Sequence, residues 1–235
     1  MEYLKQIWDL IFPKKCINCK KEGPYLCEDC LSLIEINPYQ YCLCEKLEKR
    51  DKCDKCKNRY LDKIFSAASF KNKILKEAIH KFKYGYIKDL CQPLSILILT
   101  HLQAIGMEIN KSFIIIPIPM TDKKKRRRGF NQSEEMGKTI SESTGIPLLS
   151  NMLIKIRETA PQMELKREER INNIKDCFKI EKGEIIKDKI ILLLDDVYTT
   201  GSTMEECAKA LKQSGAKEVW GLTVAREVDQ QHYFV

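Results

Sequence analysis

The sequence of 235 residues lacks several features that would assign it to common classes of protein. No apolar run approaches the roughly 18 residues of a membrane-spanning helix, so we expect no membrane span. Residues 1–12 carry Glu2 and Asp9 and no long apolar region, so we expect no secretory signal peptide and a cytoplasmic protein. The pattern G-x-x-x-x-G-K-[ST] is absent as well, which argues against a P-loop ATPase.

The sequence is rich in basic residues and in cysteine. Lys and Arg number 41 against 33 Asp and Glu, a net charge of +8, which favours acidic partners such as phosphates or nucleic acid. Eight of the 11 cysteines lie between Cys16 and Cys56. In a reducing compartment such a cluster indicates metal ligands rather than disulfides.

The clustered cysteines fall into two sets of four. A C-x-x-C turn directs two sulfurs at one ion, so two such turns complete a tetrahedral Zn²⁺ site. Free buried cysteines are the alternative interpretation for both sets. Four thiolates leave no open position on the metal, so one or two structural zinc ions are predicted. The candidate ligands are Cys16, Cys19, Cys27 and Cys30 for the first ion, and Cys42, Cys44, Cys53 and Cys56 for the second.

A strand, a turn and a helix over residues 190–211 form the most informative stretch of the chain. Five consecutive aliphatic residues at 190–194 predict a parallel strand that is buried on both faces. Asp195 and Asp196 follow at its carboxyl end, where open α/β sheets place their ligands. The next turn opens a helix, whose N-terminal N–H groups suit a phosphate. That turn contains Thr199, Thr200, Gly201, Ser202 and Thr203.

This series resembles the ribose-5-phosphate loop of type I phosphoribosyltransferases, which bind phosphoribosyl pyrophosphate (PRPP). Asp195 and Asp196 are acceptors that suit sugar hydroxyls or bound Mg²⁺, and the hydroxyl turn suits the phosphate. An acidic cap before an ordinary helix explains the acids one at a time, but not the whole series. A Walker B strand, which also ends in acids, is the other alternative.

The remaining pattern is that of an α/β domain. Strands are predicted over 65–70, 113–119, 178–180 and 219–225, and helices over 74–82, 90–102 and 133–143. A docking helix is predicted over residues 2–11. His80 and His101 stand in no partner motif, and Cys91, Cys177 and Cys207 lie in apolar surroundings, so we expect structural roles for all five.

Two basic segments are candidates for anion binding. Six consecutive cations at 123–128 need an anion or full solvation, and a solvated loop is the alternative for Lys123 to Lys125. Arg128 stands beside the predicted helix at 133–143, where it suits pyrophosphate or, with Phe130, nucleic acid. Residues 157–173, with Arg167 and Arg170, are predicted to form a lid over an anion. A solvated helix is the alternative there.

Taken together, the motifs of the whole chain resemble those of the ComF family of competence-associated proteins. One departure is visible, because the third cysteine pair in that family reads C-x-x-C, whereas here Cys44 precedes Glu45 at the expected position. The resemblance rests on the paired C-x-x-C, Lys83-Tyr84-Gly85, Pro117-Ile118-Pro119, Arg127-Arg128-Gly129-Phe130-Asn131-Gln132, the 195–203 series, and Arg157, Thr159, Pro161, Gln162, Leu165, Arg170, Asn173 and Phe178.

The resemblance implies a type I phosphoribosyltransferase-like α/β fold. It implies a five-stranded, doubly wound parallel sheet over residues 61–235 and an N-terminal zinc-binding module over residues 1–60. PRPP with Mg²⁺ is the implied ligand. Arg128, Arg167 and Arg170 would meet its pyrophosphate, and Asp195 and Asp196 would be the catalytic pair in an active enzyme.

The resemblance also implies a role in handling single-stranded DNA during natural transformation, with DNA and competence-machinery proteins as partners. An active phosphoribosyltransferase, which is a glycosyltransferase, and a PRPP sensor without turnover are the alternatives. No stretch of the sequence indicates a pocket for an acceptor base.

Overall fold

The computed structural model describes residues 13–40, 42–43, 56–108, 110, 112–157 and 174–227. The docking helix predicted at 2–11, Cys44, Cys53, and most of the predicted lid with Arg167 and Arg170 lie outside these residues. None of the described helices has the length and hydropathy needed to cross a bilayer.

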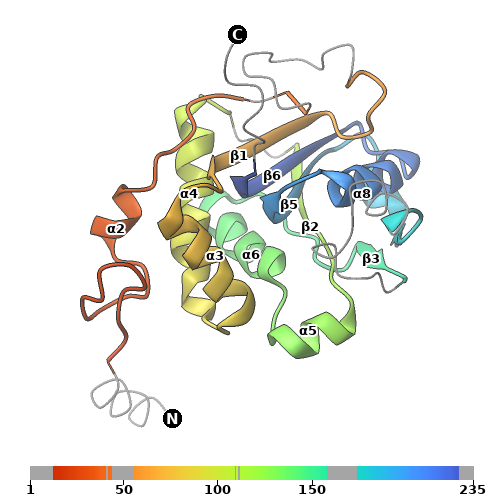
Figure 1. Cartoon of the computed structure of the whole chain (residues 1–235). Coiled ribbons are helices and arrows are strands. Elements are labelled where there is room, and N and C mark those ends of the chain that lie inside the picture. Colours follow the sequence, from red (N-terminus) through yellow and green to blue (C-terminus); the bar gives the residue numbers. More distant parts are fainter. Residues whose placement is uncertain are drawn as a thin grey trace.

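A parallel sheet of four strands forms the centre of the molecule (Figure 1). The strands are β1 (Lys63–Ser69), β2 (Phe113–Pro117), β5 (Ile190–Tyr198) and β6 (Glu218–Arg226), in the spatial order β1-β6-β5-β2. The predicted strands are therefore present, and β5 holds a central position as its aliphatic run indicated. The two faces of β5 pack into two separate hydrophobic cores. Leu192 and Leu194 lie in one core, and Ile191 and Leu193 lie in the other.

The expectation of a fifth parallel strand is wrong for the described residues. Beside β2 there is a single parallel bridge between Ile115 and Leu148. The Ile115 N–H donates to Pro147 O at 2.8 Å, and the Leu149 N–H donates to Ile115 O at 2.9 Å. Because Pro147 has no N–H, it cannot extend this ladder. The fifth place in the sheet is thus occupied by a bridge.

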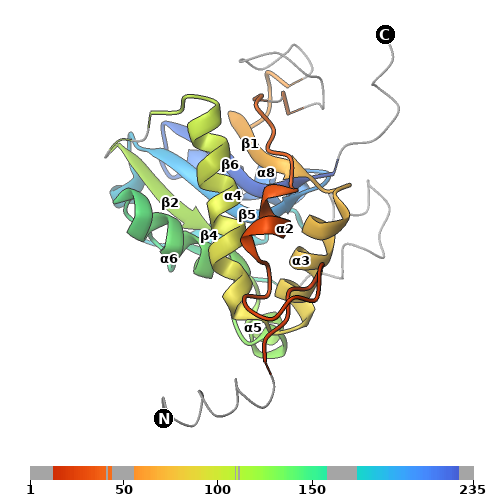
Figure 2. The same cartoon turned by 90° about the vertical axis from the view of Figure 1, so that its left-hand side faces the viewer.

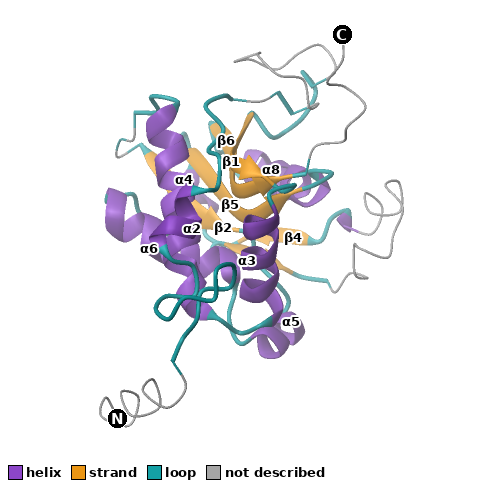
Figure 3. Cartoon of the chain, turned by 60° about the vertical axis from the view of Figure 1, so that its left-hand side comes forward, coloured by secondary structure: helices purple, strands orange, loops and turns teal. Residues whose placement is uncertain are grey.

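Helices cover both faces of the sheet, as a doubly wound fold requires (Figures 1 and 3). One face is covered by three helices, α3 (Lys73–Tyr84), α4 (Cys91–Ala104) and α6 (Gln132–Thr144). The other carries α8 (Ser202–Gln213) and a small antiparallel pair, β3 (Leu153–Lys155) with β4 (Phe178–Ile180). Short 3₁₀ turns lie at Lys88–Leu90 and Gly183–Ile186.

The N-terminal segment packs outside α3 and α4, where α2 (Glu28–Ser32) lies in both views (Figures 1 and 2). Cys16, Cys30 and Ile34 are buried in the same core as these helices. His101 of α4 is buried, and its Nδ1 lies 2.6 Å from the carbonyl oxygen of Asn37. The segment is therefore fixed to the domain by both apolar packing and polar contacts.

Residues 122–128 form a helix, α5 (Asp122–Arg128), where a solvated loop was one of the expectations. Thr121 caps it by accepting a hydrogen bond from the Lys124 N–H at 3.5 Å. Lys and Arg are good helix formers, and their charge is favourable near a helix C-terminus. Gly129, with φ of 77°, ends the helix. The cations from Lys123 to Arg128 thus lie on a helix that has no buried residues.

Candidate functional site

Asp195 and Asp196 lie near the carboxyl end of β5, because this strand extends to Tyr198 rather than ending before the two acidic residues. The Asp196 side chain is almost buried, and its Oδ1 lies 2.8 Å from the Nζ atom of Lys83 in α3. Asp195 Oδ1 accepts hydrogen bonds from the Ser133 Oγ–H at 3.2 Å and from the Asp196 N–H at 2.9 Å. Two helices therefore reach this acidic pair, which we call the acidic edge.

The environment of Asp195 shifts its titration toward neutral pH. Burial raises the pKa of Asp195 to about 7, and the charge on Asp196 raises it in the same direction. The ammonium group of Lys83 and the two hydrogen bonds oppose this shift of the Asp195 pKa. Asp195 is therefore able to exchange a proton near neutral pH.

The hydroxyl turn directly follows the acidic edge. Gly201, with φ of 74°, is the N-cap of α8, and its carbonyl oxygen accepts the Glu205 N–H at 2.8 Å. Thr200 Oγ1 and Ser202 Oγ are 2.9 Å apart. The first-turn N–H groups of a helix have no intrahelical acceptor, so the turn presents donors beside a positive dipole end. Thr199 to Thr203 thus lie at the N-terminus of α8, shortly after Asp195 and Asp196.

The floor of this turn is the ring of Tyr198. A Cβ atom at Gly201 would lie 2.6 Å from Tyr198 Cζ and closer still to its hydroxyl oxygen, so only glycine fits there. The buried guanidinium of Arg226 lies 5.1 Å from the Tyr198 ring centroid and donates to Cys42 O at 3.1 Å. Arg59 Nη1 donates to the Tyr198 hydroxyl oxygen at 3.5 Å. Arg59 therefore holds the Tyr198 ring against the turn directly, and Cys42 does so through Arg226.

Arg128 is the last residue of α5 and begins the turn of residues 128–132, which we call the arginine turn. Its Nη1 donates to Gln132 Oε1 and its Nη2 to the Tyr84 hydroxyl oxygen, both at 3.3 Å. The arginine turn is fixed, because Asn131 Nδ2 donates to Ile118 O and Gln132 Nε2 donates to Phe82 O, both at 3.1 Å. Arg128 therefore contacts Tyr84, the residue that follows Lys83 in α3.

A cleft of about 540 Å³ opens between α5 and β3. Asn131 forms part of its wall, and Asp195, Asp196 and the hydroxyl turn do not line it. Arg157, at the start of the predicted lid, donates from Nη2 to Lys175 O at 2.9 Å. The cleft is lined by five cations, Lys123, Lys125, Arg126, Lys155 and Arg157.

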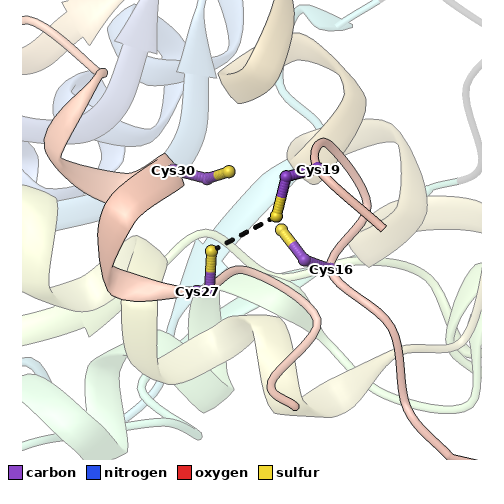
Figure 4. Close-up of side chains that lie close together, drawn as sticks. All are labelled: Cys16, Cys19, Cys27 and Cys30. Carbon is purple, nitrogen blue, oxygen red and sulfur yellow. Dashed lines mark hydrogen bonds between the residues drawn. The ribbon is translucent and has the colours of Figure 1, made fainter. Parts of the chain in front are cut away.

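The first cysteine set forms a compact cluster (Figure 4). The Sγ atoms of Cys16, Cys19, Cys27 and Cys30 all lie within 4.8 Å of one another, and those of Cys19 and Cys27 are 3.7 Å apart. Tetrahedral Zn–S bonds of about 2.3 Å place sulfurs about 3.8 Å apart, so the geometry fits a zinc ion.

The lowered pKa of one cysteine in the cluster also favours metal binding. Burial raises the pKa of Cys16, but hydrogen bonds from the Cys27, Cys19 and Asn18 amides outweigh it and lower that pKa to about 6. One thiolate is therefore available near neutral pH before any metal binds. The cluster can hold a metal ion.

Only half of the second cysteine set falls within the described residues. Cys42 and Cys56 are both buried, and their sulfur atoms are 3.8 Å apart. Cys44 and Cys53 lie outside the described residues. A second zinc site stays a prediction.

Several residues that surround the acidic edge and the hydroxyl turn were not predicted from the sequence. Lys83 entered only as part of a family motif, and Ser133, Tyr198, Arg59 and Arg226 were given no role. A signal existed for Arg226, since an arginine at the end of an apolar strand needs a specific partner when buried. The others are isolated polar residues with no spacing that marks them.

Comparison with known proteins identifies the domain. The model of the phosphoribosyl transferase domain matches residues 100–231. Competence protein F of Haemophilus influenzae is 36% identical over 115 residues, 47% of this chain and 50% of that protein. DNA utilization protein YhgH of Escherichia coli is 30% identical over 154 residues, covering 63% and 66%. Competence protein ComFC of Streptococcus pneumoniae is 29% identical over 211 residues, covering 88% and 90%.

The aligned regions span half of Competence protein F and about two thirds of YhgH. The likeness to ComFC also includes most of this chain. These relatives confirm the resemblance predicted from the motifs. Since the domain model covers more than half of the sequence, this chain belongs to the phosphoribosyl transferase domain family, as a member of its ComF type.

Proposed function

We propose that this chain binds PRPP or a related ribose phosphate at the acidic edge and takes part in handling single-stranded DNA during natural transformation. The observation that carries the proposal is the direct succession of two carboxylates and a glycine-capped hydroxyl turn at the end of a central parallel strand. Ligands of open α/β sheets lie at that edge.

Each part of the ligand has a chemical counterpart in the site. The first-turn N–H groups of α8 and the hydroxyls of Thr199 to Thr203 suit the 5-phosphate. Asp195 and Asp196 suit the ribose hydroxyls, since ionised carboxylates accept hydrogen bonds. Arg128 suits the pyrophosphate, because a guanidinium binds phosphate oxygens in a bidentate way. Arg167 and Arg170 remain proposed partners of the same group.

The two metal ions have different proposed tasks. Zn²⁺ would be held by Cys16, Cys19, Cys27 and Cys30 and would stabilise the N-terminal module, proposed over residues 1–60, against the domain at 61–235. Mg²⁺ would enter with PRPP and would supply positive charge beside its pyrophosphate. Asp195 and Asp196 stand shortly before the hydroxyl turn, at the carboxyl end of β5, and their oxygens suit that ion directly or through the sugar.

The DNA-related part of the proposal is supported by the names of the relatives and by charge. Two relatives are competence proteins and another is a DNA utilization protein. The cleft beside α5 adds five cations that suit a phosphate backbone. Proteins of a competence machinery are the further partners we propose.

Turnover is a second candidate function, favoured by the Asp195 pKa of about 7. A group that titrates near the working pH can accept a proton from an acceptor as its bond to the ribose forms and pyrophosphate leaves. Incubation of PRPP with a panel of nucleobases, followed by assay of released pyrophosphate, tests this. Release that depends on one base supports an enzyme, and binding without release supports a sensor.

Calorimetric titration with PRPP, with and without Mg²⁺, tests the ligand. We expect saturable binding that is stronger with Mg²⁺. The titration is then repeated with single-stranded DNA at two salt concentrations, because phosphate contacts weaken steeply as salt rises. Absence of any PRPP binding with Mg²⁺ would contradict the proposal.

A further inference from the structure

Two exposed tyrosines stand at the end of α3, next to the acidic edge. Lys83 reaches Asp196 at 2.8 Å, and Tyr84, the next residue, is 43% exposed. Tyr86, two residues further on, is 63% exposed. Exposed apolar side chains that gather in one patch, unlike those that are scattered singly, mark interaction sites. These rings therefore need an explanation beyond packing.

The arginine turn lies against both tyrosines. The Arg128 guanidinium carbon is 5.0 Å from the centroid of the Tyr84 ring, and Arg128 Nη2 donates to the Tyr84 hydroxyl oxygen at 3.3 Å. Gly129 lies beside Tyr86, because a Cβ atom on this glycine would be 3.8 Å from Tyr86 Cδ1. Residues 128 and 129 thus contact both rings, and we call Tyr84, Tyr86 and Arg128 together the aromatic platform.

The backbone at Tyr86 is strained. Its φ is 57°, in the left-handed region that a bulky residue rarely occupies. Burial does not compensate this strain, since most of the ring is exposed. Strained non-glycine residues gather at ligand-binding and active sites, where the conformation serves the ligand. The fold therefore holds an exposed ring in an unfavourable conformation against Gly129 of the arginine turn.

We infer that the aromatic platform of Tyr84, Tyr86 and Arg128 binds a nucleobase by stacking. Aromatic faces and guanidinium planes stack on planar heterocycles of any sequence. The inference rests on the proposed function, because the carboxylates that would hold a ribose adjoin the platform through Lys83. A base attached to that ribose, or about to be attached, would lie over the platform. It is a free acceptor base or a base of a single strand.

Binding to the bases of single-stranded DNA is tested by fluorescence anisotropy with a labelled oligothymidylate and an abasic strand of equal length. We expect the wild-type protein to bind the thymidylate about tenfold more tightly, since each stacked base contributes that much or more. Tyr86→Leu should lose this preference. Tyr39→Leu is the matched control, because Tyr39 is 54% exposed outside the platform, and it should keep the preference.

Tyr86→Gly separates stacking from folding. Glycine occupies the left-handed region without strain, so we expect its thermal midpoint to equal or exceed that of the wild type. Base-dependent binding should nevertheless fall about tenfold. A variant that folds and still prefers the base-containing strand would overturn the inference.

Binding of a free acceptor base is tested by titrating adenine, guanine, hypoxanthine and uracil into wild-type protein saturated with PRPP. Binding of a base that Tyr86→Leu weakens about tenfold supports an acceptor site. The wild-type PRPP titration reports on the proposed function by itself, so its failure is distinct from failure of the platform. The platform does not bind bases if the thymidylate binds no more tightly than the abasic strand and none of the free bases binds.

Discussion

The cysteine cluster draws its four sulfur atoms from the single short segment 16–30, whereas the acidic edge and the hydroxyl turn beside it depend on side chains as distant as Arg59 and Arg226, which contact Tyr198. The cluster is formed by two local turns, and a metal ion would hold its four thiolates together. The acidic edge and the hydroxyl turn are formed by the packing of β5, the helices α3, α6 and α8, and the segment after Cys56. The cluster should therefore depend on metal, and the acidic edge on the core.

The largest effect expected is loss of the metal from the cluster. In Cys16→Ser we expect bound zinc to fall by one ion per chain, because binding free energies of structural zinc are on the order of 10 kcal/mol and require the full ligand set. Elemental analysis of the purified protein measures it. Cys91→Ala is the control, since Cys91 lies outside the cluster. Unchanged zinc in Cys16→Ser would mean that the ligand set is wrong.

Gly201→Ala should disturb the acidic edge while leaving the cluster intact. The left-handed backbone and the contact with the Tyr198 ring together should lower the free energy of unfolding by about 2–4 kcal/mol. Gly145→Ala is the matched control, because its φ of 73° is nearly the same and nothing lies within 4 Å of its Cβ position. It should cost about 1–2 kcal/mol. Chemical denaturation measures both variants. If they lose the same free energy of unfolding, the contact with the Tyr198 ring contributes nothing to the cost of Gly201→Ala.

Asp195→Asn should stabilise the protein above neutral pH. Because the folded-state pKa of Asp195 is raised from 3.8 to about 7, ionisation opposes folding progressively as pH rises from about 4 to about 7. Asparagine removes this penalty, so the free energy of unfolding at pH 8 should rise by about 1–3 kcal/mol, with no gain below pH 4.

Asp196→Asn is the control for the Asp195 prediction. It breaks the ion pair with Lys83 and should lower the free energy of unfolding instead. Urea titrations of both variants at pH 4 and pH 8 make the comparison. A gain for Asp195→Asn that does not depend on pH would contradict the titration.

Lys83→Met should give the smallest change. The lysine lowers the pKa of Asp195 and neutralises Asp196, so its removal should raise the Asp195 pKa further and cost about 1 kcal/mol of stability. Carboxyl chemical shifts followed against pH by NMR give the midpoint. A midpoint that does not move, or that falls, would show that Lys83 does not act on the pair.

Much of the fold was predictable because the chain alternates clear strands and helices. The aliphatic run at 190–194 predicted a central strand, and the C-x-x-C spacing predicted the sulfur cluster, since both signals are local. The place of the fifth strand was not predictable, because it depends on how residues 147–149 meet Ile115. The helix at 122–128 was not predictable from its charge pattern, because the repulsion of six consecutive cations opposes a helix that the Thr121 cap and the helix propensity of Lys and Arg favour.

The site was predictable only as far as its loop. The order of the residues from Asp195 to Thr203 indicates ribose phosphate, but no spacing relates Asp196 to Lys83 or Tyr198 to Arg226. Those pairs exist because α3 crosses to the edge of β5 and because β6 ends beside it. The exposed tyrosines at 84 and 86 likewise acquire meaning only when Arg128 is seen against them.

Calorimetry of PRPP binding with Mg²⁺, comparing the wild type with the double variant Asp195→Ala and Asp196→Ala, tests the central claim most directly. Circular dichroism establishes that the variant is folded. We predict saturable binding by the wild type and none by the variant, because the sugar would lose both of its acceptors. Equal affinity in the two proteins would contradict the assignment of the acidic edge as a ribose-phosphate site.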